Sequence, residues 1–305
     1  MPNFAAMSQL ILCVGAPTFD TIFRVPAIPA APTKVLPTSC LQLAGGMAAS
    51  GGAAIARLGG NVEYWARVGD DDTGHQIITD LSAAGLDVAR VRQVPGGRSS
   101  VCTILVDDHG GRMVIPFYDP TLDADPDWLP VNELKSFDAA LVDARWPAGA
   151  ARVLQAARTA GVQAILDADI SPPGVLESLV PLASHVVFSE PALHEFTGRS
   201  DTDGALGVAA APLAGFVGVT LGARGFQWME NGACRSVPAP EVTVVDTLSA
   251  GDVFHGAFTL ALAERMTIAD AARFACAAAA LKCTRPGGRS AAPTRREVEA
   301  LLNRN

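Results

Sequence analysis

One late stretch of the chain combines residue types that could carry out phosphoryl transfer. Ser249, Ala250 and Gly251 are small residues placed just before an apolar run that predicts a helix from about residue 253 to 263. Small residues at a helix start leave backbone N–H groups bare at its positive end, where an anion can bind. Asp252 lies in the same turn, and its carboxylate could accept a proton from a hydroxyl group. An anion site beside a base suits phosphoryl transfer to an alcohol, although an ordinary turn with an acidic residue at the helix start has the same pattern.

The composition is that of a globular chain and excludes several other kinds of function. Hydrophobic residues make up 49% of the 305 positions, and the net charge of −8 leaves no basic stripe for a nucleic acid. No apolar run is long enough to span a membrane, and the N-terminus lacks the pattern of a signal peptide. Six dispersed cysteines without a Cys-x-x-Cys pair predict reduced thiols in a cytoplasmic protein.

Lysine is scarce, and its positions exclude one large class of nucleotide site. A Walker-A phosphate loop requires a lysine directly after a glycine, and none of the three lysines, Lys34, Lys135 and Lys282, follows one. No Gly-x-Gly-x-x-Gly run follows a predicted strand either. A nucleotide must therefore be bound in another way.

The elements that position these residues alternate between strand and helix. Strands are predicted at 139–142, 162–166, 185–188 and 216–221, with helical segments between them. This alternation predicts a parallel sheet covered by helices. A valine-rich run at 242–245 predicts a further strand just before Asp246.

A second, smaller sheet is predicted from two other parts of the chain, at about 16–44 and 99–120. Residues 21–43 alternate loosely and contain four prolines, which favours short edge strands. Residues 99–106 and 112–117 have the pattern of a hairpin.

Several candidate binding residues lie where predicted strands end. Asp20 follows the first strand, near the sheet edge at which α/β folds bind ligands, and Gly45 and Gly46 precede an Ala-rich helix and permit close approach of a ligand. A turn cap explains Asp20 equally well, and close helix packing explains the glycines. Four further polar residues follow the predicted strands: Asp143, Arg145, Asp167 and Asp169.

Three motifs, taken together, resemble the ribokinase (PfkB) family over nearly the whole chain. They are Gly45-Gly46 followed by Ala56-Arg57-Leu58-Gly59 and Arg67-Val68-Gly69-Asp70-Asp71; Thr220-Leu221-Gly222 with Gly225; and Asp246-Thr247 with Ala250-Gly251-Asp252. The resemblance implies one three-layer α/β domain over residues 1–305, with a mainly parallel central sheet and a small β-sheet lid. It also implies ATP-dependent phosphorylation of a hydroxymethyl group of a sugar.

The resemblance assigns roles to individual residues at the reaction centre. Asp252 is the expected general base, and the backbone amides of Ser249, Ala250, Gly251 and Asp252 form the expected anion hole. The family's usual Asp-Thr-Thr-Gly-Ala-Gly-Asp has Leu248 and Ser249 at its third and fourth positions here, which keeps the backbone donors.

The remaining roles implied by the resemblance concern the sugar, the nucleotide and metal ions. Ser50 stands where many members have an asparagine that binds the sugar. Mg²⁺ is expected to arrive with ATP, with Glu190 as a contact through water, and a loop with Asp246 and residues 283–291 is a candidate site for K⁺. The sugar-binding candidates are Asp20, Lys34, Gly45, Gly46, Ser50 and Arg145, and the nucleotide-binding candidates are Thr220, Gly222, Gly225 and Ser189.

Within this family the chain resembles the bacterial sulfofructose kinases, in segments such as Asp143-Ala-Arg145-Trp146 and 280–289. That likeness implies 6-deoxy-6-sulfofructose as the acceptor. A sulfonate requires cationic partners, which Lys34 and Arg145 could supply, although either could be ordinary surface charge.

Other functions remain open on the same residues. The acceptor alternatives are fructose, ribose, a keto-deoxy sugar acid and a nucleoside, and a sensor that binds sugar or nucleotide without turnover is a further alternative. The expected partners are the sugar and ATP, together with a second copy of the chain that pairs through the exposed lid.

Overall fold

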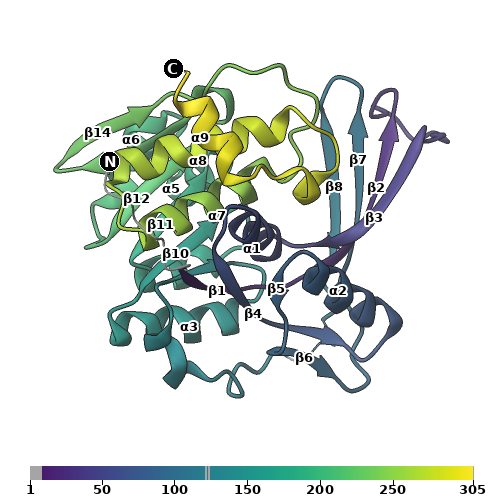
Figure 1. The fold of residues 1–305 in the computed structure, drawn as a ribbon, viewed down its shortest axis with the longest axis horizontal. Coiled ribbons are helices and arrows are strands. Elements are labelled where there is room, and N and C mark those ends of the chain that lie inside the picture. The colour runs from purple at the N-terminus through teal and green to yellow at the C-terminus, as the bar shows by residue number, and fades with distance from the viewer. Residues whose placement is uncertain (1–8, 121, 123, 305) are drawn as a thin grey trace.

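The computed structural model describes residues 9–120, 122 and 124–304, which form two sheets of unequal size (Figure 1). In this described part, the large sheet has ten strands in the order β14-β13-β12-β11-β10-β9-β1-β4-β5, with β6 paired to β4. The pairs β12–β13 and β13–β14 are antiparallel and the others are parallel. The strands are β1 (Leu10–Val14), β4 (Asn61–Gly69), β5 (Leu86–Asp87), β6 (Val91–Val94), β9 (Ala139–Asp143), β10 (Gln163–Ala168), β11 (His185–Ser189), β12 (Phe216–Thr220), β13 (Phe226–Glu230) and β14 (Ala233–Val237).

Helices cover both faces of the large sheet and make the fold three-layered. One buried apolar cluster joins the sheet to α1, α2, α7, α8 and α9, and a second joins its other face to α3, α4, α5 and α6. The prediction of a three-layer α/β fold is therefore confirmed. The helices are α1 (Met47–Arg57), α2 (Asp72–Ala83), α3 (Pro147–Ala160), α4 (Val175–Leu179), α5 (Glu190–Thr197), α6 (Thr202–Ala210), α7 (Ala250–Ala263), α8 (Ile268–Cys283) and α9 (Arg295–Leu302), with 3₁₀ turns at Val131–Ser136, Val180–Leu182, Gly222–Arg224 and Gly288–Ala291.

The central helix α7 is held close to the sheet by its composition. Every residue from 253 to 263 is buried, and all of them except His255 and Thr259 are apolar or glycine, as expected for a helix surrounded by the protein. Gly256 lets α7 approach α1, because a Cβ at this position would lie 2.3 Å from the carbonyl oxygen of Gly51. The start of α7 is thereby fixed above the carboxyl ends of the central strands.

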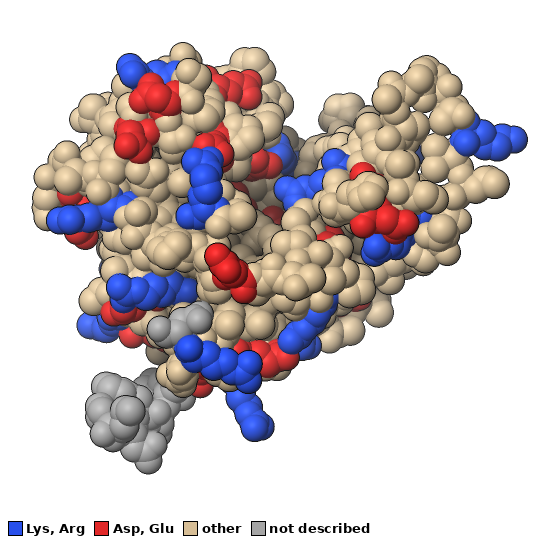
Figure 2. All heavy atoms as spheres, turned by 90° about the horizontal axis from the view of Figure 1, so that it is seen from above, with Lys and Arg blue, Asp and Glu red and all other residues tan. Residues whose placement is uncertain are grey.

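The small sheet projects from the body (Figure 1). The space-filling view shows a recess between the two, with charged side chains around it (Figure 2). Its strand order is β3-β2-β7-β8, with β2–β7 parallel and the other two pairs antiparallel. Cys102, Ile104 and Val106 form an inner face that packs against Leu248, directly before α7. The strands are β2 (Thr18–Val25), β3 (Ser39–Gly45), β7 (Val101–Asp107) and β8 (Arg112–Phe117).

Three local expectations were wrong. Residues 242–245 form no strand: Val245 donates its N–H to the carbonyl oxygen of Cys283 at 2.8 Å, and Pro238 and Pro240 precede the run. Helix α7 begins at Ala250, three residues earlier than predicted, which places Asp252 inside its first turn. Asp20 lies within β2 of the small sheet rather than on the rim of the large one.

Within the described residues, no helix is both long and apolar enough to cross a bilayer.

Candidate active site

Two backbone N–H groups in the first turn of α7, those of Gly251 and Asp252, lie outside the hydrogen bonds of the helix. Ser249 adopts a left-handed conformation, with φ 60° and ψ 14°, and turns the chain into the helix. The N–H of Ala250 donates to the carbonyl oxygen of Thr247 at 3.2 Å. The amides of Gly251 and Asp252 have no acceptor within the helix, because first-turn amides precede its first hydrogen bonds. A Cβ at Gly251 would meet no atom within 4 Å, so an anion has room to bind there.

Asp252 has the electrostatic properties of a general base. Burial raises the pKa of its carboxyl group to about 7, and the nearby Asp167 carboxylate adds to the rise, while His255 and Ser249 oppose it. A carboxylate whose pKa lies near the working pH can both accept and release a proton. The position beside the helix amides therefore combines a base with an anion site.

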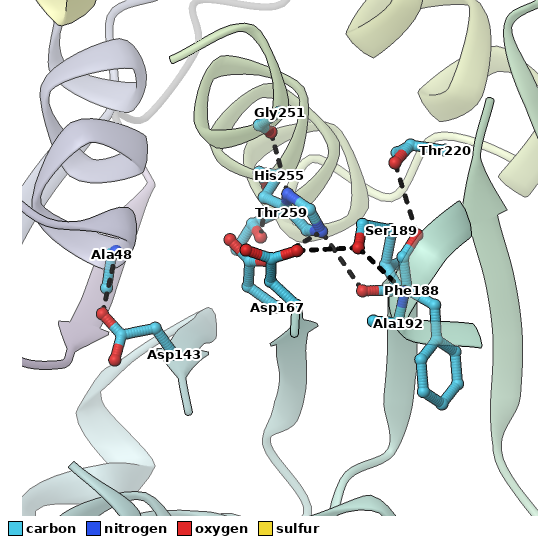
Figure 3. A network of polar contacts seen from close by, with 12 residues as sticks. Ala48, Asp143, Asp167, Phe188, Ser189, Ala192, Thr220, Gly251, His255 and Thr259 are labelled. Atoms are coloured by element: carbon cyan, nitrogen blue, oxygen red, sulfur yellow. Dashed lines mark hydrogen bonds and ion pairs between the residues drawn. The ribbon is translucent and has the colours of Figure 1, made fainter. Parts of the chain in front are cut away.

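A buried histidine fixes the first turn of α7 against the sheet (Figure 3). His255 Nδ1 lies 2.8 Å from the carbonyl oxygen of Gly251, and Nε2 lies 3.3 Å from that of Val187 and 3.4 Å from Asp167 Oδ1. Burial lowers the pKa of His255 and raises that of Asp167 well above its usual value, which favours the neutral form of each. This arrangement ties the first turn of α7 to the ends of β10 and β11.

Asp20 and Gly45 meet at the base of the small sheet. A Cβ at Gly45 would lie 1.9 Å from Asp20 Oδ2, so only glycine leaves room for this carboxylate. Thr18 Oγ1 donates to Asp20 Oδ1 at 2.6 Å, and burial raises the pKa of Asp20 to about 6. Gly46 is the N-cap residue of α1, in which Ser50 is buried one turn further on.

Asp143 is fully buried at the end of β9, where it contacts three segments of the chain. Its carboxylate accepts a hydrogen bond from the N–H of Ala48, at the start of α1, at 3.1 Å (Figure 3). It accepts another from the N–H of Arg145 at 2.8 Å. A Cβ at Gly15 would lie 1.9 Å from Asp143 Oδ2, so β1 passes directly beneath it. Asp143 therefore holds β1, β9 and α1 in register around the site.

The two cations expected at an acidic sugar lie in different surroundings. Arg145 has 18% of its side chain exposed, pairs with Asp169 at 3.2 Å and donates to the carbonyl oxygen of Ile170 at 2.6 Å. Lys34 is exposed in the connection between β2 and β3, and no hydrogen bond or ion pair with another described residue holds it. Arg145 is thus positioned in advance, whereas Lys34 is not.

The candidate nucleotide loop follows β12. Thr220 Oγ1 donates to the carbonyl oxygen of Phe188 at 3.3 Å, and Leu221 N–H to that of Gly225 at 2.8 Å (Figure 3 shows the first contact). Gly225 has φ 95°, and a Cβ there would lie 2.0 Å from the carbonyl oxygen of Val237, so a side chain would break the loop. Gly222 also has positive φ.

The residues expected to contact Mg²⁺ and the nucleotide are engaged with the protein itself. Glu190 forms an ion pair with Arg224 and accepts a hydrogen bond from Thr202 Oγ1 at 2.9 Å. Ser189 caps α5 and donates to Asp169 at 2.7 Å. The described residues contain no group of three acidic, histidine or cysteine side chains arranged around a metal. This arrangement fits a Mg²⁺ held by phosphates and water, rather than by a protein cage.

The site also contains residues that the sequence reasoning did not single out. Lys282 is fully buried with its ammonium against Asp246. Arg289 pairs with Asp80 and donates to the carbonyl oxygen of Ala44, just before Gly45. For Lys282 the sequence offered one signal, a charged residue in an Ala-rich helix. No sequence pattern indicated that Lys282 pairs with Asp246 or that Arg289 pairs with Asp80.

A parallel sheet with a base at a helix start, open backbone donors and a small sheet across a recess defines an α/β group-transfer enzyme. Residues 8–295 match the model of the pfkB family carbohydrate kinases, and the chain belongs to that family. The predictions of family membership and of a carbohydrate kinase are thereby confirmed.

Known relatives cover almost the full length of the chain. A putative ribokinase from Agrobacterium tumefaciens superposes with a TM-score of 0.94 at 44% identity, over 97% of this chain and 98% of its own. The ATP-dependent ribose-1-phosphate kinase of Halopiger xanaduensis is 30% identical, over 96% of this chain and 98% of its own. The ribokinase of Bacillus subtilis is 28% identical, over 96% and 99%.

Proposed function

We propose that this chain transfers the γ-phosphoryl group of ATP to a hydroxymethyl group of an anionic ketose, with 6-deoxy-6-sulfofructose as the leading candidate. The observation that carries the reaction type is Asp252, with a pKa of about 7, beside the open first-turn amides of α7. Asp252 accepts the proton of the acceptor hydroxyl as the new O–P bond forms. The amides of Gly251 and Asp252 stabilise the negative charge on the moving group.

The other candidate residues orient the two substrates. Asp20 and Gly45 bind sugar hydroxyls at the base of the small sheet, and Gly46 and Ser50 shape the same end. The turn from Thr220 to Gly225 receives the nucleotide. Mg²⁺ bound with ATP neutralises phosphate charge, and the protein contributes to its position through water rather than direct ligands.

Arg145 supports an anionic acceptor. Its guanidinium is held at the end of β9 by Asp169 and Ile170, and a planar guanidinium suits the oxygens of a sulfonate or phosphate. A relative of 30% identity carries the name of a ribose-1-phosphate kinase, which is also a kinase of an anionic sugar. Lys34 joins the site only if the connection between β2 and β3 folds inward.

A neutral sugar is the second candidate, and two observations favour it. First, the Arg145 guanidinium already pairs with the Asp169 carboxylate. Second, Pro116 lies on the same face of the small sheet as Asp20, because both are in register with Cys102. Proline has no backbone N–H to donate to a sulfonate there. Two relatives carry the names ribokinase and fructokinase, and ribose and fructose are neutral sugars.

An ADP-release assay with purified protein separates these candidates. The acceptors are 6-deoxy-6-sulfofructose, fructose 6-phosphate, fructose, ribose and a keto-deoxy sugar acid, each with MgATP. The proposal predicts the highest kcat/KM for sulfofructose, and a higher value for fructose than for both anionic ketoses would reject the anionic acceptor. ADP release that no acceptor increases would instead indicate a sensor.

We also propose a homodimer formed through the outer face of the small sheet. Val101, Met113, Ile115 and Phe117 share this face by register and are each at least 40% exposed. An apolar patch of this kind marks an interaction surface. Light scattering of the wild type should give twice the monomer mass, and Ile115→Lys should give the monomer mass; a wild-type monomer would exclude the dimer.

The unpaired state of all six cysteines, which lie in the described part, supports the proposed cytoplasmic location.

A further inference from the structure

A buried lysine lies directly behind the catalytic turn. Lys282 is in the last turn of α8 and has no exposed surface. Its ammonium donates to the carbonyl oxygen of Asp246 at 2.8 Å and lies 3.3 Å from Asp246 Oδ2. Burial lowers the pKa of Lys282, and the Asp246 carboxylate opposes that shift and favours the charged form. A charge so completely buried requires a specific partner.

Asp246 connects this ammonium to the backbone that shapes the anion site. Oδ1 accepts a hydrogen bond from the N–H of Leu248 at 2.8 Å, and Oδ2 accepts those of Gly287 at 3.1 Å and Gly288 at 3.4 Å. The N–H groups of Val245 and Asp246 both donate to the carbonyl oxygen of Cys283. Residues 245–248 are therefore hydrogen-bonded to the end of α8 and to the 287–288 turn, and α7 begins two residues after them.

The oxygens that a free monovalent cation would use at Asp246 are already taken. The family resemblance places K⁺ at this aspartate, but the carbonyl oxygen and Oδ2 both face the Lys282 ammonium. A second positive charge at this distance would be repelled by the first. The residues present do not fit a bound K⁺.

We propose that Lys282 is a tethered counter-cation that positions the anion-binding turn of residues 249–252, so that this enzyme needs no monovalent cation. The proposal rests on the proposed role of that turn in phosphoryl transfer. Lys282 is a positioning residue, since its ammonium acts through Asp246 and contacts neither the acceptor nor ATP. A side chain provides the charge permanently, whereas a free ion must bind each time.

The first test replaces the charge and offers a free one. Initial rates are measured at constant ionic strength in choline, potassium or ammonium chloride, with ATP as its Tris salt and MgCl₂. The variants are Lys282→Met, which keeps the length of the stem, and Lys135→Met as the control, because Lys135 is exposed on a distant 3₁₀ turn. Wild type and Lys135→Met should change by less than about twofold between the three salts.

Lys282→Met should lose about 10- to 100-fold in kcat in choline chloride, because a displaced catalytic turn misaligns the reacting groups. Potassium or ammonium chloride should raise the kcat of Lys282→Met at least about tenfold above its value in choline chloride, since an ion can then occupy the vacated position. Wild-type activation by K⁺ of about tenfold or more would overturn the proposal. A wild-type kcat in Lys282→Met, or a loss that no cation repairs, would overturn it as well.

A second readout does not depend on turnover. The melting temperature of Lys282→Met should rise by a few degrees when KCl replaces choline chloride, whereas that of the wild type should not change, because ligand binding stabilises only the protein with a vacant site. This arm decides the proposal even if no tested sugar is phosphorylated, which would be a failure of the proposed function alone. If Lys282→Met does not fold, the salt dependence of the wild-type rate and melting temperature decides: independence of K⁺ supports the tethered cation, and dependence rejects it.

Discussion

The two ends of the recess are built in different ways. The proposed phosphoryl end consists of backbone donors and Asp252, all within the single segment from 246 to 252, and its supports are buried. The proposed sugar end gathers side chains from β2, the start of α1 and the end of β9, and part of it is the exposed small sheet. On this proposal the reaction type lies in one short stretch, whereas the choice of acceptor depends on residues that converge from distant parts of the chain.

Removing the base at the phosphoryl end should have the largest effect. Asp252→Asn keeps the shape of the side chain but cannot accept the hydroxyl proton, and kcat should fall by about 10²–10⁴-fold. Steady-state ADP release with the best acceptor measures the change, and Asp72→Asn, at an exposed position in α2, serves as the control. Turnover within threefold of wild type would exclude Asp252 as the base.

A change at the sugar end should affect binding selectively. Arg145→Ala should raise KM for anionic ketoses by about 10- to 100-fold, the value of a charge-assisted hydrogen bond, and leave KM for fructose nearly unchanged. Arg158→Ala removes an exposed arginine of α3 and is the matched control. An equal rise for charged and neutral acceptors would show that Arg145 supports the fold rather than the choice of acceptor.

The pH profile tests whether the raised pKa belongs to the working base. Because Asp252 must lose its proton before it can accept one, kcat should fall about tenfold for each pH unit below about 7. The folded pKa lies above the unfolded value near 4, so the stability that Asp252 contributes is complete below pH 4 and is lost as pH rises toward 7. Asp252→Asn should therefore melt at a higher temperature than wild type at pH 8, and the difference should shrink at pH 5. A flat rate profile from pH 5 to 8 would contradict the assignment.

The contact between the two ends should give the smallest effect. Arg112 at the start of β8 donates to the carbonyl oxygen of Thr247 at 2.7 Å and so links the small sheet to the segment before α7. Arg112→Ala should lower kcat/KM by about two- to tenfold, as expected for one exposed hydrogen bond. Arg24→Ala, which removes the neighbouring exposed pair with Asp108, should leave kcat/KM unchanged. Identical effects of the two variants would remove the special role of Arg112.

Local patterns predicted most of the fold and the helix start on which the proposed reaction centre lies. The alternation of strands and helices could be predicted because each element is recognised from neighbouring residues in the sequence. The open helix start could be predicted for the same reason, since first-turn geometry depends on the few residues before α7. The valine run at 242–245 gave a wrong strand prediction because the prediction considered only neighbouring residues in the sequence. β-branched residues favour a strand only when a partner strand is beside them, and here the partner is the single carbonyl oxygen of Cys283.

The sequence by itself determined the three-layer fold, the family and the segment that holds Asp252. The tertiary structure decided which charges meet: Lys282 with Asp246, 36 positions apart, Arg145 with Asp169, and Arg289 with Asp80. Partner choice depends on burial and distance after folding, because a buried charge must find its counter-charge wherever the packed chain brings one. At Asp246 that counter-charge is a lysine of the chain itself, held against the segment whose small residues and aspartate first indicated phosphoryl transfer.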